Sequence, residues 1–150
     1  MNGAALHLAR PEDLERVLPL VAAMHAELGI TQTDEARRAA LAPLLEGSPH
    51  GAVYLIGPQR APIGYLVVTF GWSVAFGGMD GSVDEIFIRP GVRGRGIASE
   101  VLGAICRALK AAGLKAIHIE VDRQDEAARR LYGRCRFEAR EPSMRMTRRL

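Results

Sequence analysis

Cysteine is scarce in this chain of 150 residues, which contains only Cys106 and Cys135. Two cysteines are too few for a disulfide framework, and neither they nor the four histidines have the spacing of metal ligands. We therefore expect no metal site and a reducing, cytoplasmic location. Aromatic residues make up only 5% of the chain, so few side chains could form a stacking platform for single-stranded nucleic acid.

Long apolar runs are also absent. The longest, residues 63–70, is far shorter than the roughly 18–20 residues that a membrane helix needs. Residues 1–8 have neither a basic start nor an apolar core, so no secretory signal is visible. Because the sequence also lacks repeats and an internal linker, it predicts one domain over residues 1–150 that does not enter a membrane.

Positive charge is in slight excess, and it is almost entirely arginine. The net charge of +3 comes from 20 basic and 17 acidic residues, and Lys110 and Lys115 are the only lysines. The planar guanidinium suits phosphate binding, although codon bias explains an arginine excess equally well. So small a net charge argues against nucleic acid as the partner, but the arginine-rich residues 144–150 keep a basic nucleic-acid-binding module as an alternative.

Apolar residues at helical spacing predict four helices, over residues 11–28, 33–46, 97–112 and 125–135. Pro11 suits the first turn of a helix, and Gly29 suits its end. Thr33 is a typical capping residue for the second helix. Pro19 lies inside the first pattern and predicts a kink or a break there.

Runs rich in β-branched and aromatic residues predict strands over residues 5–8, 52–56, 63–70, 82–88, 116–121, 137–139 and 144–147. The second and third of these form a hairpin, and the glycine-rich residues 71–81 are expected to be a flexible connection. The strand over residues 82–88, the helix after it and the next strand make a βαβ unit with parallel strands. We therefore expect an α/β (α+β) fold with a mixed central β-sheet flanked by about four α-helices.

The most informative stretch is residues 89–98, Arg-Pro-Gly-Val-Arg-Gly-Arg-Gly-Ile-Ala, which joins a strand to the start of a helix. Unpaired N–H groups and the helix dipole favour an anion there, and the glycines allow a phosphate to approach the backbone closely. The stretch lacks the lysine of a nucleotide P-loop, and Ser99 stands where the dinucleotide fingerprint needs glycine. A phosphate or pyrophosphate site is the favoured interpretation, and an ordinary strand-to-helix turn is the alternative.

Residues 93–98 resemble the Arg/Gln-x-x-Gly-x-Gly/Ala signature of the GNAT family of N-acetyltransferases. Residues 83–90 resemble that family's fourth strand and its exit. Residues 121–137 resemble the later Asn-x-x-Ala-x-x-Leu-Tyr helix that ends in Gly-Phe, with two departures. Asp125 stands where the family often has asparagine, and Arg136 replaces the glycine, so the turn there is expected to differ in shape. The resemblance implies a GNAT-like fold over nearly the whole chain.

The resemblance implies acetyl coenzyme A as the co-substrate. Backbone groups of Ile86, Phe87 and Ile88 would pair with its pantetheine arm as an added strand does. The N–H groups of the glycine-rich turn would hold its pyrophosphate, with Asp125 and Ala128 as further cofactor contacts. The residues of the turn are Arg93, Gly94, Arg95, Gly96, Ile97 and Ala98.

The implied reaction is direct attack of a primary amine, from a small molecule or a peptide, on the acetyl thioester. Tyr132 matches the family's usual general acid, which returns a proton to the departing thiolate. The alternative is that Tyr132 only packs in the last helix.

Asp84 and Glu85 are the candidate bases, with a water chain as the alternative. A regular strand points neighbouring residues to opposite faces, so only one carboxylate would enter the substrate cleft. On that alternation Asp84 shares a face with Ile86, and Glu85 shares the other with Val83 and Phe87. The position of Asp84 matches the base of some family members, which favours it.

A second class of function stays open at this point. The chain could be a catalytically degenerate module that binds acyl coenzyme A without transferring its group. Dimers are common in the resembled family, so a homodimer is possible, although no residue identifies an interface. The sequence does not identify the amine acceptor.

Overall fold

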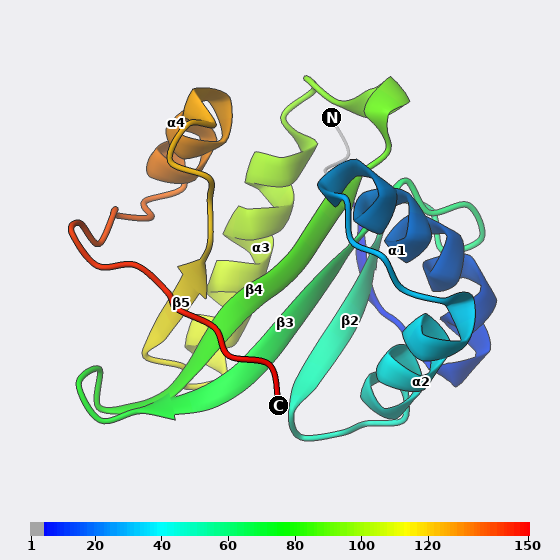
Figure 1. The fold of residues 1–150 in the computed structure, drawn as a ribbon, viewed down its shortest axis with the longest axis horizontal. Coiled ribbons are helices and arrows are strands. Elements are labelled where there is room, and N and C mark those ends of the chain that lie inside the picture. The colour runs from blue at the N-terminus through cyan, green and yellow to red at the C-terminus, as the bar shows by residue number, and fades with distance from the viewer. Residues whose placement is uncertain (1–4) are drawn as a thin grey trace.

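The computed structural model describes residues 5–150, so the first four residues, part of the stretch assessed for a secretory signal, lie outside it. A five-stranded sheet in the order β1-β2-β3-β4-β5 forms its centre (Figure 1). The strands are β1 Leu6–Leu8, β2 Gly51–Ile56, β3 Gly64–Ser73, β4 Gly78–Ile88 and β5 Ala116–Ile119. β1 to β4 are antiparallel neighbours and β4 is parallel to β5, so the prediction of a mixed sheet is confirmed.

The four predicted α-helices are also confirmed. They are α1 Leu14–Leu28, α2 Asp34–Leu45, α3 Ile97–Ala111 and α4 Glu126–Arg134, with short 3-10 turns at η1 Pro11–Asp13 and η2 Pro90–Val92. The Thr33 hydroxyl accepts from the Ala36 N–H at the start of α2. Gly29 ends α1 with a φ of 68°. Within residues 5–150, none of the helices is long and apolar enough to cross a membrane.

α1 continues through Pro19, so the expected alternative of a break is wrong. Proline removes one hydrogen bond to the carbonyl four residues earlier, which belongs to Glu15. Both Pro19 and Glu15 are exposed, so water can satisfy the freed carbonyl. The apolar stripe of the same helix, which includes Val17 and Val21, stays buried and holds the helix against the sheet.

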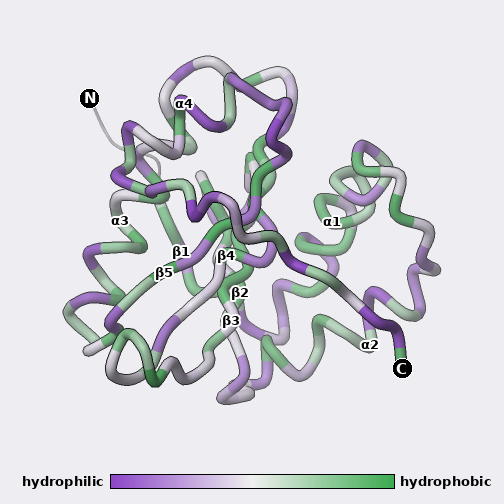
Figure 2. Tube along the Cα trace, turned by 60° about the vertical axis from the view of Figure 1, so that its left-hand side comes forward, coloured by the Kyte–Doolittle hydropathy of each residue, from purple (hydrophilic) through white to green (hydrophobic). Residues whose placement is uncertain are grey.

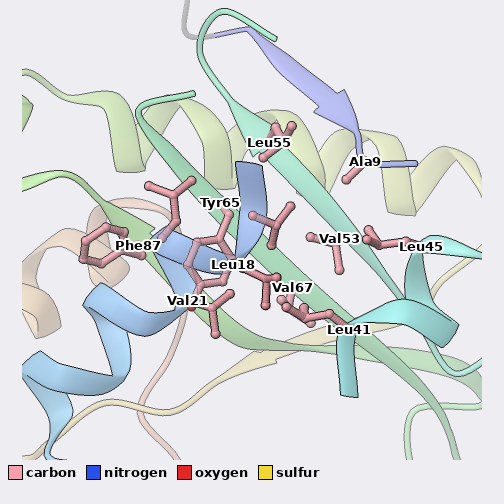
Figure 3. Packing of buried hydrophobic residues seen from close by; sticks show 12 residues of the cluster. Ala9, Leu18, Val21, Leu41, Leu45, Val53, Leu55, Tyr65, Val67 and Phe87 are labelled. Carbon is pink, nitrogen blue, oxygen red and sulfur yellow. The ribbon is translucent and has the colours of Figure 1, made fainter. Parts of the chain in front are cut away.

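Two apolar clusters lie on opposite faces of the sheet. α1 and α2 cover one face, where Tyr65, Val67 and Phe87 are buried (Figure 3). α3 covers the other face, where Leu66 and Val68 are buried. Because both faces are covered, the central strand β3 is apolar on both sides rather than alternating.

Residues 71–81 are not the flexible connection that their glycines predict. β3 and β4 continue as a ladder in which Trp72 lies opposite Met79, so only residues 74–77 form the turn. Glycine weakens a strand by its entropy, but it keeps both of its backbone hydrogen bonds. The continued pairing with β3 therefore outweighs the local preference.

The two strands predicted over residues 137–139 and 144–147 are absent, and β5 ends at Ile119 rather than at residue 121. The chain after α4 is irregular and largely hydrophilic (Figure 2). Met144 and Met146 are almost fully exposed, so their alternation with arginine buries no apolar surface that could offset the ordering of a strand. The segment is tied to the molecule by an Arg145–Glu120 ion pair of 2.7 Å.

Candidate active site

β4 loses its neighbour β5 before it ends. The parallel pairing stops at Val83 and Ile119, yet β4 runs on to Ile88 while the chain after β5 turns away towards α4 (Figure 1). From residue 84 to residue 88, the backbone groups that point away from β3 have no strand partner among the described residues. We call this stretch the free β4 edge. It contains the predicted contacts Ile86, Phe87 and Ile88.

A β-bulge lies where the free β4 edge begins. Val67 is opposite Glu85 and Val68 is opposite Val83, which leaves Asp84 without a partner on β3. The expectation that Glu85 shares a face with Val83 is therefore wrong. Val83 packs on the α3 side, whereas Glu85 contacts the α1 side. Bulges of this kind re-aim side chains, and none was visible in the sequence.

Glu85 is held by a polar network that joins α1 and α2 to the sheet. Its Oε1 accepts from the Tyr65 hydroxyl at 2.6 Å, and its Oε2 lies 2.8 Å from His25 Nε2. Arg37 Nε donates to His25 Nδ1 at 3.2 Å. Because the guanidinium is always protonated, Nδ1 must be the acceptor, so Nε2 carries the hydrogen that is donated to Glu85. Both carboxylate oxygens of Glu85 are thus occupied.

Asp84, in contrast, is exposed, and its side chain makes no hydrogen bond with any of residues 5–150. Partial burial raises its pKa above the ordinary aspartate value of 3.8, and the charge of Glu85 raises it further. The charge of Arg145 acts in the opposite direction, and that of Glu120 adds to the rise. Of the two neighbouring carboxylates, Asp84 is the one free to accept a proton.

The glycine-rich turn leads directly from β4 into α3. Gly94 and Gly96 have φ values of 79° and 77°, which L side chains rarely adopt, and an added Cβ at either would meet nothing within 4 Å. Gly96 caps α3, and the N–H groups of Ile97 and Ala98 in its first turn have no intrahelical partner. The turn therefore presents backbone donors in open space, beside the positive end of the helix dipole.

Arg93 is turned away from this row of donors. Its Nε donates to the Ile88 carbonyl at 2.7 Å, and its guanidinium is paired with Glu27 at 2.9 Å. The guanidinium also lies over the Phe87 ring, 5.4 Å from its centre. Arg93 thus fixes the turn against β4 and α1. Because the Arg93 side chain is occupied by these contacts, the backbone groups of the turn are the donors available to an anion. Arg95 is exposed.

α4 carries the remaining predicted residues. The Asp125 carboxylate accepts from the Ala128 N–H at 3.0 Å and so caps the helix. Tyr132 packs edge-on against Phe137, and its pKa is raised by burial and then by the charge of Asp125. Arg136 has a φ of 69°, the left-handed conformation that glycine favours.

Sequence reasoning missed His25, Arg37 and Tyr65. Glu85 lies 60 residues from His25 in the chain, so no local pattern joins them. One signal was present: His25 follows Val21 by four residues and so falls on the buried stripe of α1. A polar side chain at such a position usually needs a partner in the fold.

Replacing Tyr65 by phenylalanine keeps the buried ring and removes the hydroxyl, which donates to Glu85 and also contacts Met24 Sδ at 3.1 Å. We expect the free energy of unfolding to fall by about 1–3 kcal/mol, because a half-buried carboxylate oxygen loses its partner. Urea denaturation would measure the change. Tyr54→Phe is the control, since the Tyr54 hydroxyl has no hydrogen bond within the described residues, and equal losses in the two variants would contradict the network.

Comparisons with known proteins bear on the family and the fold of the chain. A model of the acetyltransferase (GNAT) family matches residues 14–137. A structure from Arthrobacter sp. FB24, assigned as an acetyltransferase, is 30% identical with a TM-score of 0.83, over 97% of this chain and 96% of that one. The structure of a ribosomal-protein-alanine N-acetyltransferase from Brucella melitensis biovar Abortus 2308 is 19% identical, with a TM-score of 0.77. The match covers 97% of this chain and 99% of that one. The structure of an aminoglycoside acetyltransferase from an uncultured soil metagenomic sample, in complex with sisomicin, is 14% identical, with a TM-score of 0.82. The match covers 98% of this chain and 96% of that one. No curated protein sequence matches.

Proposed function

Because the chain belongs to the GNAT family of acetyltransferases, we propose that it transfers the acetyl group of acetyl coenzyme A to a primary amine. The observation that carries the proposal is the free β4 edge, which begins at the exposed Asp84 and leads into the glycine-rich turn of α3. The free β4 edge suits an extended chain of amides, the glycine-rich turn suits a diphosphate, and Asp84 suits an amine.

The residues present fit acetyl coenzyme A. The free β4 edge offers backbone donors and acceptors to the pantetheine amides, and Gly94 and Gly96 border open space in which a diphosphate can approach the backbone. Asp125 and Ala128 already bond to each other, so their part in binding would be to fix the start of α4. When bound, acetyl coenzyme A supplies the acetyl thioester.

Gly94→Ala tests the pyrophosphate site. Alanine in a left-handed conformation costs roughly 1–2 kcal/mol of stability, and its methyl group would enter the space reserved for the phosphates. We expect thermal stabilisation by acetyl coenzyme A, about 2.7 kcal/mol at 100 times the dissociation constant, to be largely lost.

Gly77→Ala is the matched control for this variant. Gly77 has a φ of 89° and the same open surroundings, but it lies in the β3–β4 turn. The control should lose similar stability and keep the full thermal shift with acetyl coenzyme A. An undiminished shift in Gly94→Ala would remove the glycine-rich turn from the binding site.

Asp84 is the proposed base. An amine attacks only when neutral, and the exposed Asp84 carboxylate can take its proton while Glu85 is occupied by its partners. The two acidic groups also attract a cationic acceptor. A small-molecule or peptide amine fits this charge, and the names of two structural neighbours are those of enzymes that acetylate aminoglycosides and a protein alanine.

The pH dependence of kcat/KM tests this role. Deprotonated Asp84 accepts the proton, so activity should fall as the pH drops through its raised pKa, which lies above 3.8. Glu85→Gln removes a charge that raises this pKa and should move the acidic limb to lower pH. Asp84→Asn should lower kcat about 100-fold.

Asp84→Asn should also raise the melting temperature at neutral pH. A raised pKa in the folded protein means that ionised Asp84 disfavours folding at pH values above that pKa, and asparagine removes the charge. A variant that is inactive because it unfolds would show the opposite change. Unchanged kcat in Asp84→Asn would exclude Asp84 as the base.

Tyr132 is the proposed acid. Its raised pKa keeps the phenol protonated across the working pH range, ready to give its proton to the departing sulfur. Tyr132→Phe should lower kcat about 100-fold while thermal stabilisation by acetyl coenzyme A persists. Tyr54→Phe, another tyrosine whose pKa burial raises, is the control and should retain wild-type kcat.

These readouts also separate the alternative function. A degenerate module that only binds acyl coenzyme A would give the thermal shift in the wild type but no transfer to any amine. A cytoplasmic location and a homodimer complete the proposal. The location rests on the scarcity of cysteine, and the homodimer rests on the family resemblance alone.

A further inference from the structure

The end of the chain crosses the sheet as an irregular segment, residues 138–150, which we call the C-terminal segment. Figure 1 shows it passing in front of β5 and β4. Every residue of the C-terminal segment is exposed, so no buried apolar surface holds it in place. Its position therefore depends on a few side-chain contacts.

Two arginines of the C-terminal segment reach the elements beneath it. The Arg140 guanidinium lies over the Phe76 ring of the β3–β4 turn, 5.6 Å from the ring centre. Arg145 is paired with Glu120, the residue after β5, at 2.7 Å. The side chains of Arg145 and Glu120 are each 69% exposed, and ion pairs as exposed as this one contribute little to stability. Another cation can therefore displace Arg145 at low cost.

The Arg145–Glu120 pair lies beside the proposed base. Asp84 and Glu120 each directly follow the last paired rung of β4 and β5, so both stand where the two strands part. Beyond the effect of burial, the charge of Arg145 lowers the pKa of Asp84 and that of Glu120 raises it. Register and electrostatics thus agree that the Arg145 guanidinium is close to Asp84.

Arg145 compensates part of the negative charge at this point. Its guanidinium faces the charges of Asp84, Glu85 and Glu120, and it is the ion-pair partner of Glu120 among the described residues. If Arg145 moved away, the three carboxylates would lie together with less compensation, and such a field concentrates cations. An alkylammonium group can pair with a carboxylate as a guanidinium does. A cationic acceptor and Arg145 are therefore alternative partners of Glu120.

We propose that the C-terminal segment competes with the acceptor amine, with Arg145 holding on Glu120 the place of the acceptor's second positive charge. A diamine or polyamine places one amine beside Asp84 and pairs another ammonium group with Glu120, which displaces the guanidinium. An amine with a single charge leaves Arg145 in place. The inference rests on the proposed function and adds to it the class of acceptor, an amine with at least two positive charges.

Calorimetric titration of 1,5-diaminopentane into the protein saturated with coenzyme A tests the proposal. Coenzyme A carries no acetyl group, so the heat reports binding without turnover. Arg145→Gln removes the competitor and should bind the diamine about three-fold more tightly, the order expected for an exposed ion pair. Arg148→Gln makes the same charge change in the C-terminal segment, at a residue without an ion pair to any described residue, and should bind as the wild type does.

A double-mutant cycle with Glu120→Gln assigns the effect to this carboxylate. Glu120→Gln should weaken binding of the diamine and abolish the gain from Arg145→Gln, because both effects act through the same ion pair. Pentylamine has the same carbon chain without the second ammonium group, so its binding should gain nothing from Arg145→Gln. Unfolding curves of all variants check that each is folded.

Four results would overturn the proposal. Equal affinity of the wild type and Arg145→Gln for the diamine would make the ion pair a structural contact only. An equal gain in Arg148→Gln would reduce the effect to net charge. A gain that persists in the Glu120→Gln background would remove Glu120 from acceptor binding. So would a diamine that binds neither the wild type nor any variant. None of these results bears on acetyl transfer itself, which wild-type turnover and its loss in Tyr132→Phe report.

Discussion

The short parallel contact between β4 and β5 is the constraint on which the candidate site depends. β5 has only four residues, so it pairs with β4 from Asp80 to Val83 and no further. A longer β5 would cover the free β4 edge and use the backbone groups that a ligand needs. The bulge at Asp84, in the ladder between β3 and β4, begins at the same rung and places Glu85 on the α1 side. The end of the β4–β5 pairing therefore produces the backbone surface, and the bulge in the β3–β4 ladder at the same rung produces the exposed carboxylate.

Two neighbouring carboxylates acquire different roles through their surroundings. Glu85 is packed against α1 and bonded by Tyr65 and His25, so it acts as a fixed negative charge. Asp84, one residue earlier, makes no hydrogen bond with a described residue, and its pKa is raised by partial burial and by the charge of Glu85. The difference does not lie in the two side chains, which are chemically alike. It comes from the bulge and from the Arg37–His25 contact, which sets the tautomer of the histidine.

Elements with strong local signals could be predicted from the sequence. The helices have identifiable caps such as Thr33 and Gly29, and the glycines of the turn at 94 and 96 do adopt positive φ. The features that the sequence did not predict depend on partners that are distant in the chain. The bulge at Asp84 is set by pairing with β3, and the Glu85–His25 bond joins residues 60 apart in the chain. The C-terminal segment has strand-like alternation, but no apolar surface there receives its methionines.

The proposed acid and base stand on elements that the protein itself joins weakly. Asp84 belongs to the buried sheet, whereas Tyr132 belongs to α4, a helix with no fully buried residue. α4 packs mainly on α3, and it lies on the side of β4 where the strand has no paired neighbour after Val83. A ligand that pairs with that edge and with the start of α3 would lie between the two groups and add contacts to both. Binding the acyl donor and setting the distance between acid and base are then one event, because the protein alone supplies few contacts that fix α4 against β4.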